Sequence, residues 1–195
     1  MRWRRLFLFT FLGCLCVTAC NRRGLDGRAS GGGLDPARSS DSNPSGAMPS
    51  NPLVHSTNAL PKLASLKLWV GKQVIEAEVA IKAHELATGM MYRTNIAENE
   101  GMLFRLPFPQ RASFYMKNTE VPLSCAYIDA EGTILEIHDL QPRNEKPVPS
   151  ATDNIQYVLE TAQGWFERNN IGIGTVIRTD HGSLAEVFSR NRRQL

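Results

Sequence analysis

Three polar side chains, Lys117, Asn118 and Thr119, directly follow the apolar and aromatic run at residues 114–116. Such a run is typical of a buried strand, so we expect the polar trio where that strand leaves the core. A cation, an amide and a hydroxyl at the mouth of a rigid strand could hold a small ligand. The three side chains could instead satisfy backbone groups in a turn, as Asn and Thr often do.

The expected pocket has two further rim residues, Tyr115 and Arg93, and Glu100 is an additional candidate for ligand contact. Because Lys117 and Arg93 are cationic, the pocket is expected to favour a small polar, anionic or polyhydroxyl ligand. We assign no catalytic residue. The alternative function is a hydrolase-type enzyme of the cell envelope, with Glu100 or Glu85 as the base.

A third interpretation is a structural protein of the envelope that contacts a partner through an apolar face near Met90 and Met91.

Phosphate loops, dinucleotide fingerprints and Cys-x-x-Cys pairs do not occur in the sequence. The spacing of the histidines does not indicate a metal cluster. We therefore expect no metal and no cofactor. The four histidines are His55, His84, His138 and His181.

The charge of the chain argues against nucleic acid as a partner. The formal net charge is +3, but residues 62–195 contain 15 Lys and Arg against 16 Asp and Glu. A nucleic-acid-binding domain needs a concentrated basic face. The near-neutral body therefore predicts a protein that does not bind nucleic acid.

Residues 1–19 have the pattern of an export signal. Arg2, Arg4 and Arg5 form a charged start, and residues 6–17 form an apolar run of twelve residues, which is too short to span a membrane. The last four positions, Val17-Thr18-Ala19-Cys20, resemble the lipobox of bacterial lipoproteins. That resemblance implies acylation of Cys20 and a stable membrane anchor.

The expected location is the cell envelope, on the outer membrane or on the periplasmic face of the inner membrane. Residues 20–61 are rich in Gly, Ser and Pro and poor in large apolar side chains, so we predict a lipidated cysteine followed by a disordered tether. Residues 62–195 form the predicted folded domain. Only Cys125 lies within it, in an apolar stretch, which indicates a buried and unreactive thiol without a disulfide.

Hydrophobic periodicity predicts a mainly β (α+β) domain. Short antiparallel strands form a compact barrel-like or sandwich domain with one or two short helices. Pro107 and Pro109 are expected to break the chain between two strands. A helix is predicted at residues 84–92, with Gly89 indicating close packing or a helix end. Strands are expected at residues 66–70, 75–81, 101–104, 111–116, 123–128, 134–139, 155–161 and 176–179.

Several of these stretches together resemble the family called domain of unknown function 192. The resemblance runs from about residue 75 to residue 179. It is carried by residues 85–93, 100–104, 113–119, 121–123, 128–129 and 158–160. Family members are compact, mainly β domains that are often exported, and the family has no settled activity. The resemblance therefore implies a fold and little chemistry.

The chain departs from the family pattern at three positions. Tyr115 replaces a tryptophan, and Ser124 and Thr175 each replace an aspartate. If the family used those carboxylates in acid–base or metal chemistry, this chain would lack it. Glu160 is a further candidate for chemistry, although an ion pair between Arg93 and Glu100 or Glu160 could instead fix the helix to the sheet.

Overall fold

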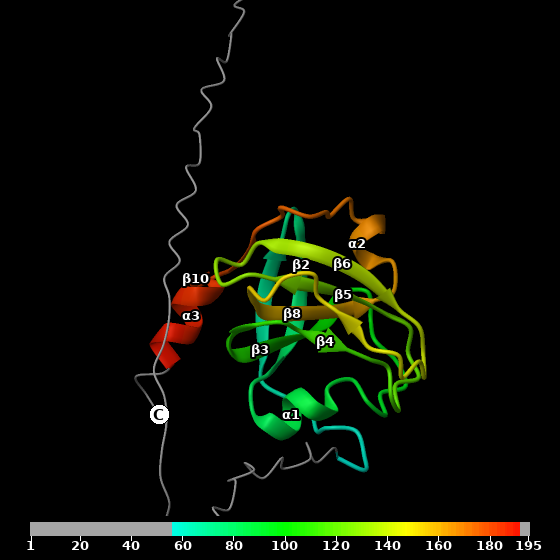
Figure 1. The fold of residues 1–195 in the computed structure, drawn as a ribbon. Coiled ribbons are helices and arrows are strands. Elements are labelled where there is room, and N and C mark those ends of the chain that lie inside the picture. The colour runs from blue at the N-terminus through cyan, green and yellow to red at the C-terminus, as the bar shows by residue number, and fades with distance from the viewer. Residues whose placement is uncertain (1–55, 192–195) are drawn as a thin grey trace, which may run out of the picture. The chain divides into compact units, whose positions relative to one another are not determined.

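The computed structural model describes residues 56–191 and shows one large, strongly curved sheet with three short helices (Figure 1). The mainly β prediction is confirmed. In spatial order the strands of this sheet are β10 (Gly182–Ser183), β9 (Ile177–Thr179), β1 (Ser65–Val70), β2 (Gln73–Ala80), β3 (Glu100–Gln110), β8 (Ile155–Ala162), β5 (Leu123–Ile128) and β6 (Ile134–Leu140).

The strands are antiparallel except for β2 and β3, which run parallel. A parallel pair needs a crossover connection, and the chain between these two strands contains α1 (Ala83–Thr88). The named strands do not close into a barrel. However, an isolated antiparallel bridge joins Thr133, just before β6, to Val176, just before β9. The sheet is therefore barrel-like.

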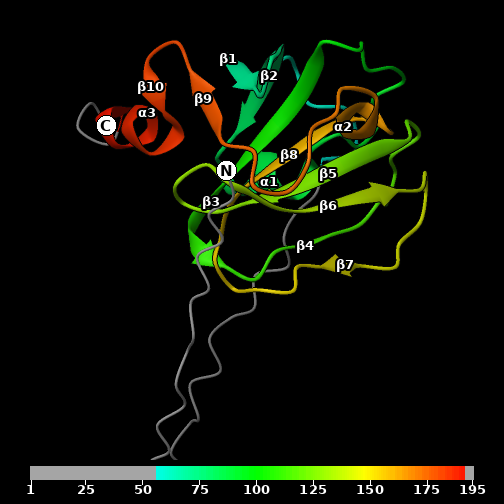
Figure 2. The same cartoon turned by 90° about the horizontal axis from the view of Figure 1, so that it is seen from above.

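Each face of the sheet carries its own core. The inner core contains Leu68, Leu103, Leu159 and Phe166, and the chain segments at both ends of the sheet contribute to it. The second core, on the other face, includes Phe104, Tyr127 and neighbouring residues. This second core is covered by α1, by the loops that follow it, and by a separate two-stranded sheet, β4 (Ser113–Phe114) with β7 (Val148–Pro149). Figure 2 shows the β4–β7 pair lying apart from the main sheet.

Two helices lie on opposite sides of the domain, α2 (Trp165–Arg168) and α3 (Leu184–Asn191) (Figures 1 and 2). The sequence analysis did not predict α3, which packs Leu184 and Phe188 onto the inner core. Over the described residues 56–191, no helix is long and apolar enough to cross a bilayer. The predicted leader, Cys20 and most of the predicted tether lie outside the described residues.

Three predicted elements have different bounds in the structure. β3 continues through Pro107 and Pro109 to Gln110, with an irregular register against β8 after Arg105, so the two prolines do not break the chain. The strand expected at residues 111–116 contains only the two residues of β4. The helix expected at residues 84–92 ends at Thr88, because Gly89 turns into the left-handed region at φ 48°.

Candidate functional site

A cavity of about 140 Å³ lies between α1 and the second core. One wall is formed by residues 86–91, from the end of α1 and the turn after it. The opposite walls are formed by Phe104 of β3, residues 113–115 at β4, Thr119 and Glu160. Most of these side chains are apolar or aromatic, and a few polar groups are set among them. Small-ligand sites in proteins have this composition.

Glu160 of β8 brings a carboxyl group to the wall of this cavity. Its side chain is buried, with 4% of the residue exposed. Burial alone raises the pKa of this carboxyl to about 8, and no hydrogen bond or neighbouring cation counteracts that rise. The carboxyl group is therefore mostly protonated at neutral pH, and among the described residues none forms a hydrogen bond or an ion pair with it.

The register of the sheet places Glu160 in one row with other side chains of the same face. Directly opposite residues in neighbouring strands project to the same side. Glu78 of β2 is opposite Met102 of β3, Met102 is opposite Glu160, and Glu160 is opposite Cys125 of β5. Cys125 is in turn opposite His138 of β6. The row thus contains two carboxyl groups, separated by the buried Met102.

The first of these carboxyl groups, that of Glu78, has partners. Arg93 Nη2 lies 2.9 Å from Glu78 Oε2, and the amide of Leu63 donates to the same oxygen at 2.7 Å. Both side chains of the ion pair are largely buried, with 22% and 14% exposure. The sequence analysis expected Arg93 to pair with Glu100 or Glu160. The structure instead pairs it with Glu78, because the turn after α1 returns to β2.

The wall formed by α1 is held in place by its own caps. The carboxylate of Glu85 accepts hydrogen bonds from the amides of Ile81 and Lys82, both at 3.0 Å. Burial opposes ionisation of Glu85, but these amide bonds and the nearby Lys82 ammonium together lower its pKa. At the other end, a Cβ at Gly89 would lie 2.9 Å from the ring of Phe104, so only glycine allows this approach. The helix is thereby fixed close to β3.

The turn after α1 is tied to the predicted polar trio. Tyr92 and Asn118 both adopt positive φ, at 63° and 53°. The amide of Tyr92 donates to the Asn118 carbonyl oxygen, and Asn118 Nδ2 donates to the Tyr92 hydroxyl, both at 2.8 Å. Residues other than glycine keep a positive φ only where the surrounding contacts fix the backbone conformation. We call this pair the Tyr92–Asn118 clasp; it joins two segments that border the cavity.

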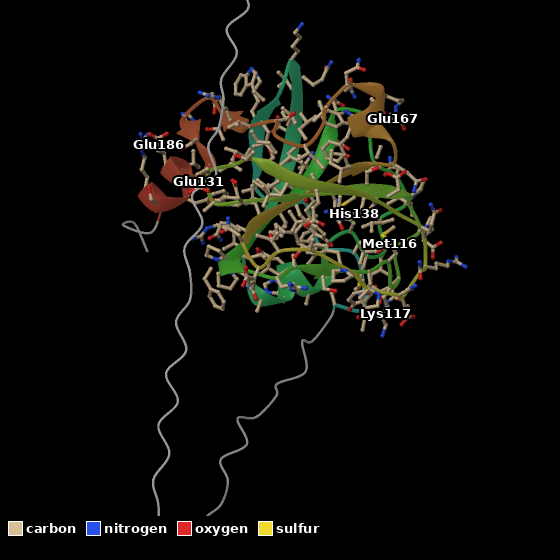
Figure 3. All side chains as sticks on the ribbon, turned by 45° about the horizontal axis from the view of Figure 1, so that its top comes forward. Met116, Lys117, Glu131, His138, Glu167 and Glu186 are labelled. Carbon is tan, nitrogen blue, oxygen red and sulfur yellow. The ribbon has the colours of Figure 1, made fainter. Side chains whose placement is uncertain are left out.

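The structure brings only part of the predicted site together. Tyr115 and Thr119 line the cavity, whereas Lys117, Asn118, Arg93 and Glu100 are not among its lining residues. Asn118 belongs to the clasp, and the Thr119 hydroxyl donates to the Lys117 carbonyl oxygen at 3.1 Å. These contacts agree with the turn interpretation of the trio. In Figure 3, Lys117 lies at the edge of the domain.

The residues named for the alternative functions are also placed. Glu100 is exposed at the start of β3, where its carboxylate accepts a hydrogen bond from the Ala97 amide at 3.3 Å. Glu85 is used in the helix cap. Met90 and Met91 are 7% and 5% exposed and line the cavity, so they do not form the surface face proposed for a partner.

Cys125 is a free and fully buried thiol, as predicted. Burial raises its pKa far above the usual range, and the neighbouring Glu160 carboxyl adds to the rise. Within residues 56–191, no three His, Cys, Asp or Glu side chains gather into a possible metal site.

Ser124 and Thr175, which replace family aspartates, have different surroundings. Ser124 is opposite Asp139 in the β5–β6 register, and its hydroxyl donates to the Asp139 carboxylate. The same hydroxyl accepts a hydrogen bond from the Gly164 amide at 2.8 Å, just before α2. Asp139 thus supplies a carboxylate beside Ser124. Thr175 accepts a hydrogen bond from the Ile134 amide through its backbone, at 2.9 Å.

The sequence analysis named Glu160 as a candidate for chemistry and, alternatively, as an ion-pair partner of Arg93. Its signal was its position: a carboxyl group in β8 directly after the apolar residues 157–159. A strand with such a pattern is buried on both faces, so any acid within it loses its water. What the sequence could not show was that no cation would approach it.

Comparison with known proteins identifies a matching family and similar solved structures. The profile of the family described as DUF192, "Uncharacterized ACR", matches residues 66–179. A crystal structure of a protein of unknown function from Novosphingobium aromaticivorans has 30% identity and a TM-score of 0.57, and the match covers 60% of this chain and 86% of that one. No curated protein matches the chain.

A second crystal structure is that of a Sinorhizobium meliloti protein provisionally named a transcription regulator. It has 28% identity and a TM-score of 0.58, and the match covers 62% of this chain and 98% of that one. Both relatives therefore share the folded domain.

Proposed function

Since this chain belongs to the domain of unknown function 192 family, whose name assigns no activity, we propose a function from the site itself. The domain binds a small ligand in the cavity beside α1. A lipid on Cys20 holds that domain at a membrane of the cell envelope. The protein is thus a tethered extracytoplasmic binding module.

The observation that carries the binding proposal is the carboxyl group of Glu160. Burial of an ionisable group is unfavourable unless partners compensate for it, and no residue in the range 56–191 does so. Perturbed acids that border a cavity are a common mark of functional sites. A ligand that hydrogen-bonds to this group would supply the missing partner.

The size of the cavity limits the ligand. A volume near 140 Å³ is similar to the roughly 150 Å³ apolar cavity that accommodates benzene in another protein. The ligand, or the part of it that enters, therefore has on the order of five to ten non-hydrogen atoms. The lining requires a mainly apolar body with one polar end. The anionic ligand expected from Lys117 and Arg93 has less support, because neither residue lines the cavity.

The lipid anchor is supported by the sequence of the leader, which ends in Val17-Thr18-Ala19-Cys20. The amide of Ser56 donates to Thr88 Oγ1 at 3.1 Å, and Thr88 lines the cavity. The tether thus joins the domain beside the proposed site.

The lipid anchor can be tested by metabolic labelling with palmitate. We expect the wild-type protein to incorporate the label and Cys20→Ser to lose it. Equal labelling of both proteins would contradict the anchor.

Binding can be tested by thermal unfolding of the full chain with a panel of small alkyl compounds that carry one polar group. Leu86 is half-buried and lines the cavity, so Leu86→Trp should fill the space from its rim. Val74 is 40% exposed on β2 and does not line the cavity, so Val74→Trp is the matched control. We expect ligand-dependent increases in Tm for the wild type and the control, and none for Leu86→Trp. No increase for the wild type with any compound would contradict the proposal.

A further inference from the structure

The walls of the cavity near Glu160 contain aromatic rings and thioethers. Phe104 and Phe114 form a T-shaped pair with ring centroids 4.9 Å apart, and both line the cavity with Tyr115. Met90 and Met91 form part of the α1 wall. Aromatic rings attract cations through the negative charge of their faces, and thioethers are soft and polarisable. Such a lining suits an alkylated cation better than a strongly hydrated anion.

We propose that the ligand of this cavity is a small organic cation, an ammonium group with short alkyl substituents, whose charge is met by the Glu160 carboxylate. This inference rests on the proposed binding function and adds the chemical class of the ligand. Carboxylate and aromatic rings together form a site for substituted ammonium groups.

The cations of the domain itself do not fill this role. Arg93 is paired with Glu78, which is separated from Glu160 by Met102 in the strand row. Lys117 is not among the lining residues. An anionic ligand would meet the Glu160 carboxyl without a compensating charge. A neutral ligand could hydrogen-bond to the protonated carboxyl, but it would gain nothing from the attraction of the aromatic walls for positive charge. A cation matches both the carboxyl group and the aromatic walls.

The other titratable groups around Glu160 are buried or already have partners. Cys125 and Tyr127 on β5 both have raised pKa values because of burial, so they stay neutral. On β6, His138 Nε2 lies 3.0 Å from Glu136 Oε2, and the Asp139 carboxylate accepts a hydrogen bond from the Ser124 hydroxyl. On β2 the charge of Glu78 is paired with Arg93. The α1 wall contributes no charged lining residue, and the remaining titratable lining group is the phenol of Tyr115.

Three probes with the same alkyl chain and different heads separate the possibilities: butylammonium, 1-butanol and butyrate. Binding is measured by NMR titration of the full chain carrying Cys20→Ser, which prevents acylation. At pH 8 we expect butylammonium to bind at least tenfold more tightly than 1-butanol, and butyrate to bind most weakly. Glu160→Gln should reduce butylammonium binding to the level at which the same variant binds 1-butanol, and the dispersion of its amide NMR signals shows that the variant is folded.

The pH dependence provides a second readout. Because butylammonium needs the ionised form of Glu160, its affinity should fall roughly fifty-fold from pH 8 to pH 6, while that of 1-butanol stays constant. Equal binding of butylammonium and 1-butanol, or tighter binding of butyrate, would overturn the cation inference and leave the binding function in place. If none of the three probes binds, both proposals are overturned.

Discussion

Two carboxyl groups on one face of the sheet, those of Glu78 and Glu160, have opposite surroundings. They lie in the same row of opposed residues and are separated only by Met102. Glu78 has a guanidinium and a backbone amide as partners, whereas Glu160 has neither and borders a cavity. The comparison suggests different uses of the same residue type. One acid joins the turn after α1 to the sheet through Arg93, and the other borders the cavity that we propose as the ligand site.

The largest expected effect concerns the stability contribution of Glu160. Its pKa of about 8 lies above the ordinary value of 4.5, so the unfolded state ionises first as the pH rises. The contribution of protonated Glu160 to the free energy of unfolding is therefore fully present below pH 4.5. It is lost as the pH rises to about 8. Between pH 6 and pH 9 the wild type should lose about 3 kcal/mol relative to Glu160→Gln, measured by urea unfolding. Parallel pH profiles for the two proteins would contradict this.

The next effect converts Glu78 into a second unpaired acid. Arg93→Met removes the guanidinium and leaves the Glu78 carboxylate largely buried, and we expect a loss of about 2 kcal/mol in the free energy of unfolding. Stability should also begin to fall with rising pH, as it does for Glu160. Arg143→Met breaks the exposed pair with Glu120 and serves as the control. It should leave the urea midpoint nearly unchanged, and an equal loss in both variants would refute the distinction.

An effect of similar size concerns the approach of α1 to the sheet. Gly89→Ala combines a positive φ with a Cβ that would meet the Phe104 ring at 2.9 Å, so a loss of about 2 kcal/mol is expected. Gly174→Ala has positive φ as well, at 88°, but its Cβ would meet nothing within 4 Å. This control should cost about 1 kcal/mol. The same loss in both variants would show that close packing against Phe104 contributes nothing.

The smallest effect is expected at the Tyr92–Asn118 clasp. Tyr92→Phe removes one hydrogen bond of 2.8 Å and keeps the ring, so a loss of about 1 kcal/mol in unfolding free energy is expected. Asn118→Gly removes the same bond and keeps the positive φ. If both side chains stabilise the protein only through this hydrogen bond, the double variant should lose no more unfolding free energy than the more destabilised single variant. Additive losses would indicate that the two side chains act separately.

Much of the fold could be predicted from local patterns. The alternation of apolar and polar residues predicted the two strands of the β1–β2 hairpin with nearly the observed bounds. Continuous apolar runs predicted β5 and β8. The prolines of β3 were misleading because they lie where its pairing with β8 is irregular and fewer ladder hydrogen bonds are needed. The sequence analysis did not predict the α3 helix.

The candidate site was predicted less well. Tyr115 and Thr119 line the cavity as expected, yet the cations thought to define the ligand lie elsewhere. Local sequence indicates which side chains follow a strand, but it does not show which way a turn directs them. The importance of Glu160 depends on the absence of a partner. That property follows from the packing of β2, β3 and β8 together, not from any one segment.

The most direct measurement is an NMR titration of the Glu160 side-chain carboxyl carbon in the full chain, with and without butylammonium. A midpoint near pH 8 without the probe, and a lower midpoint with it, is the predicted result. A midpoint near the ordinary value of 4.5, unchanged by the probe, would contradict the claim that an uncompensated acid forms the ligand site.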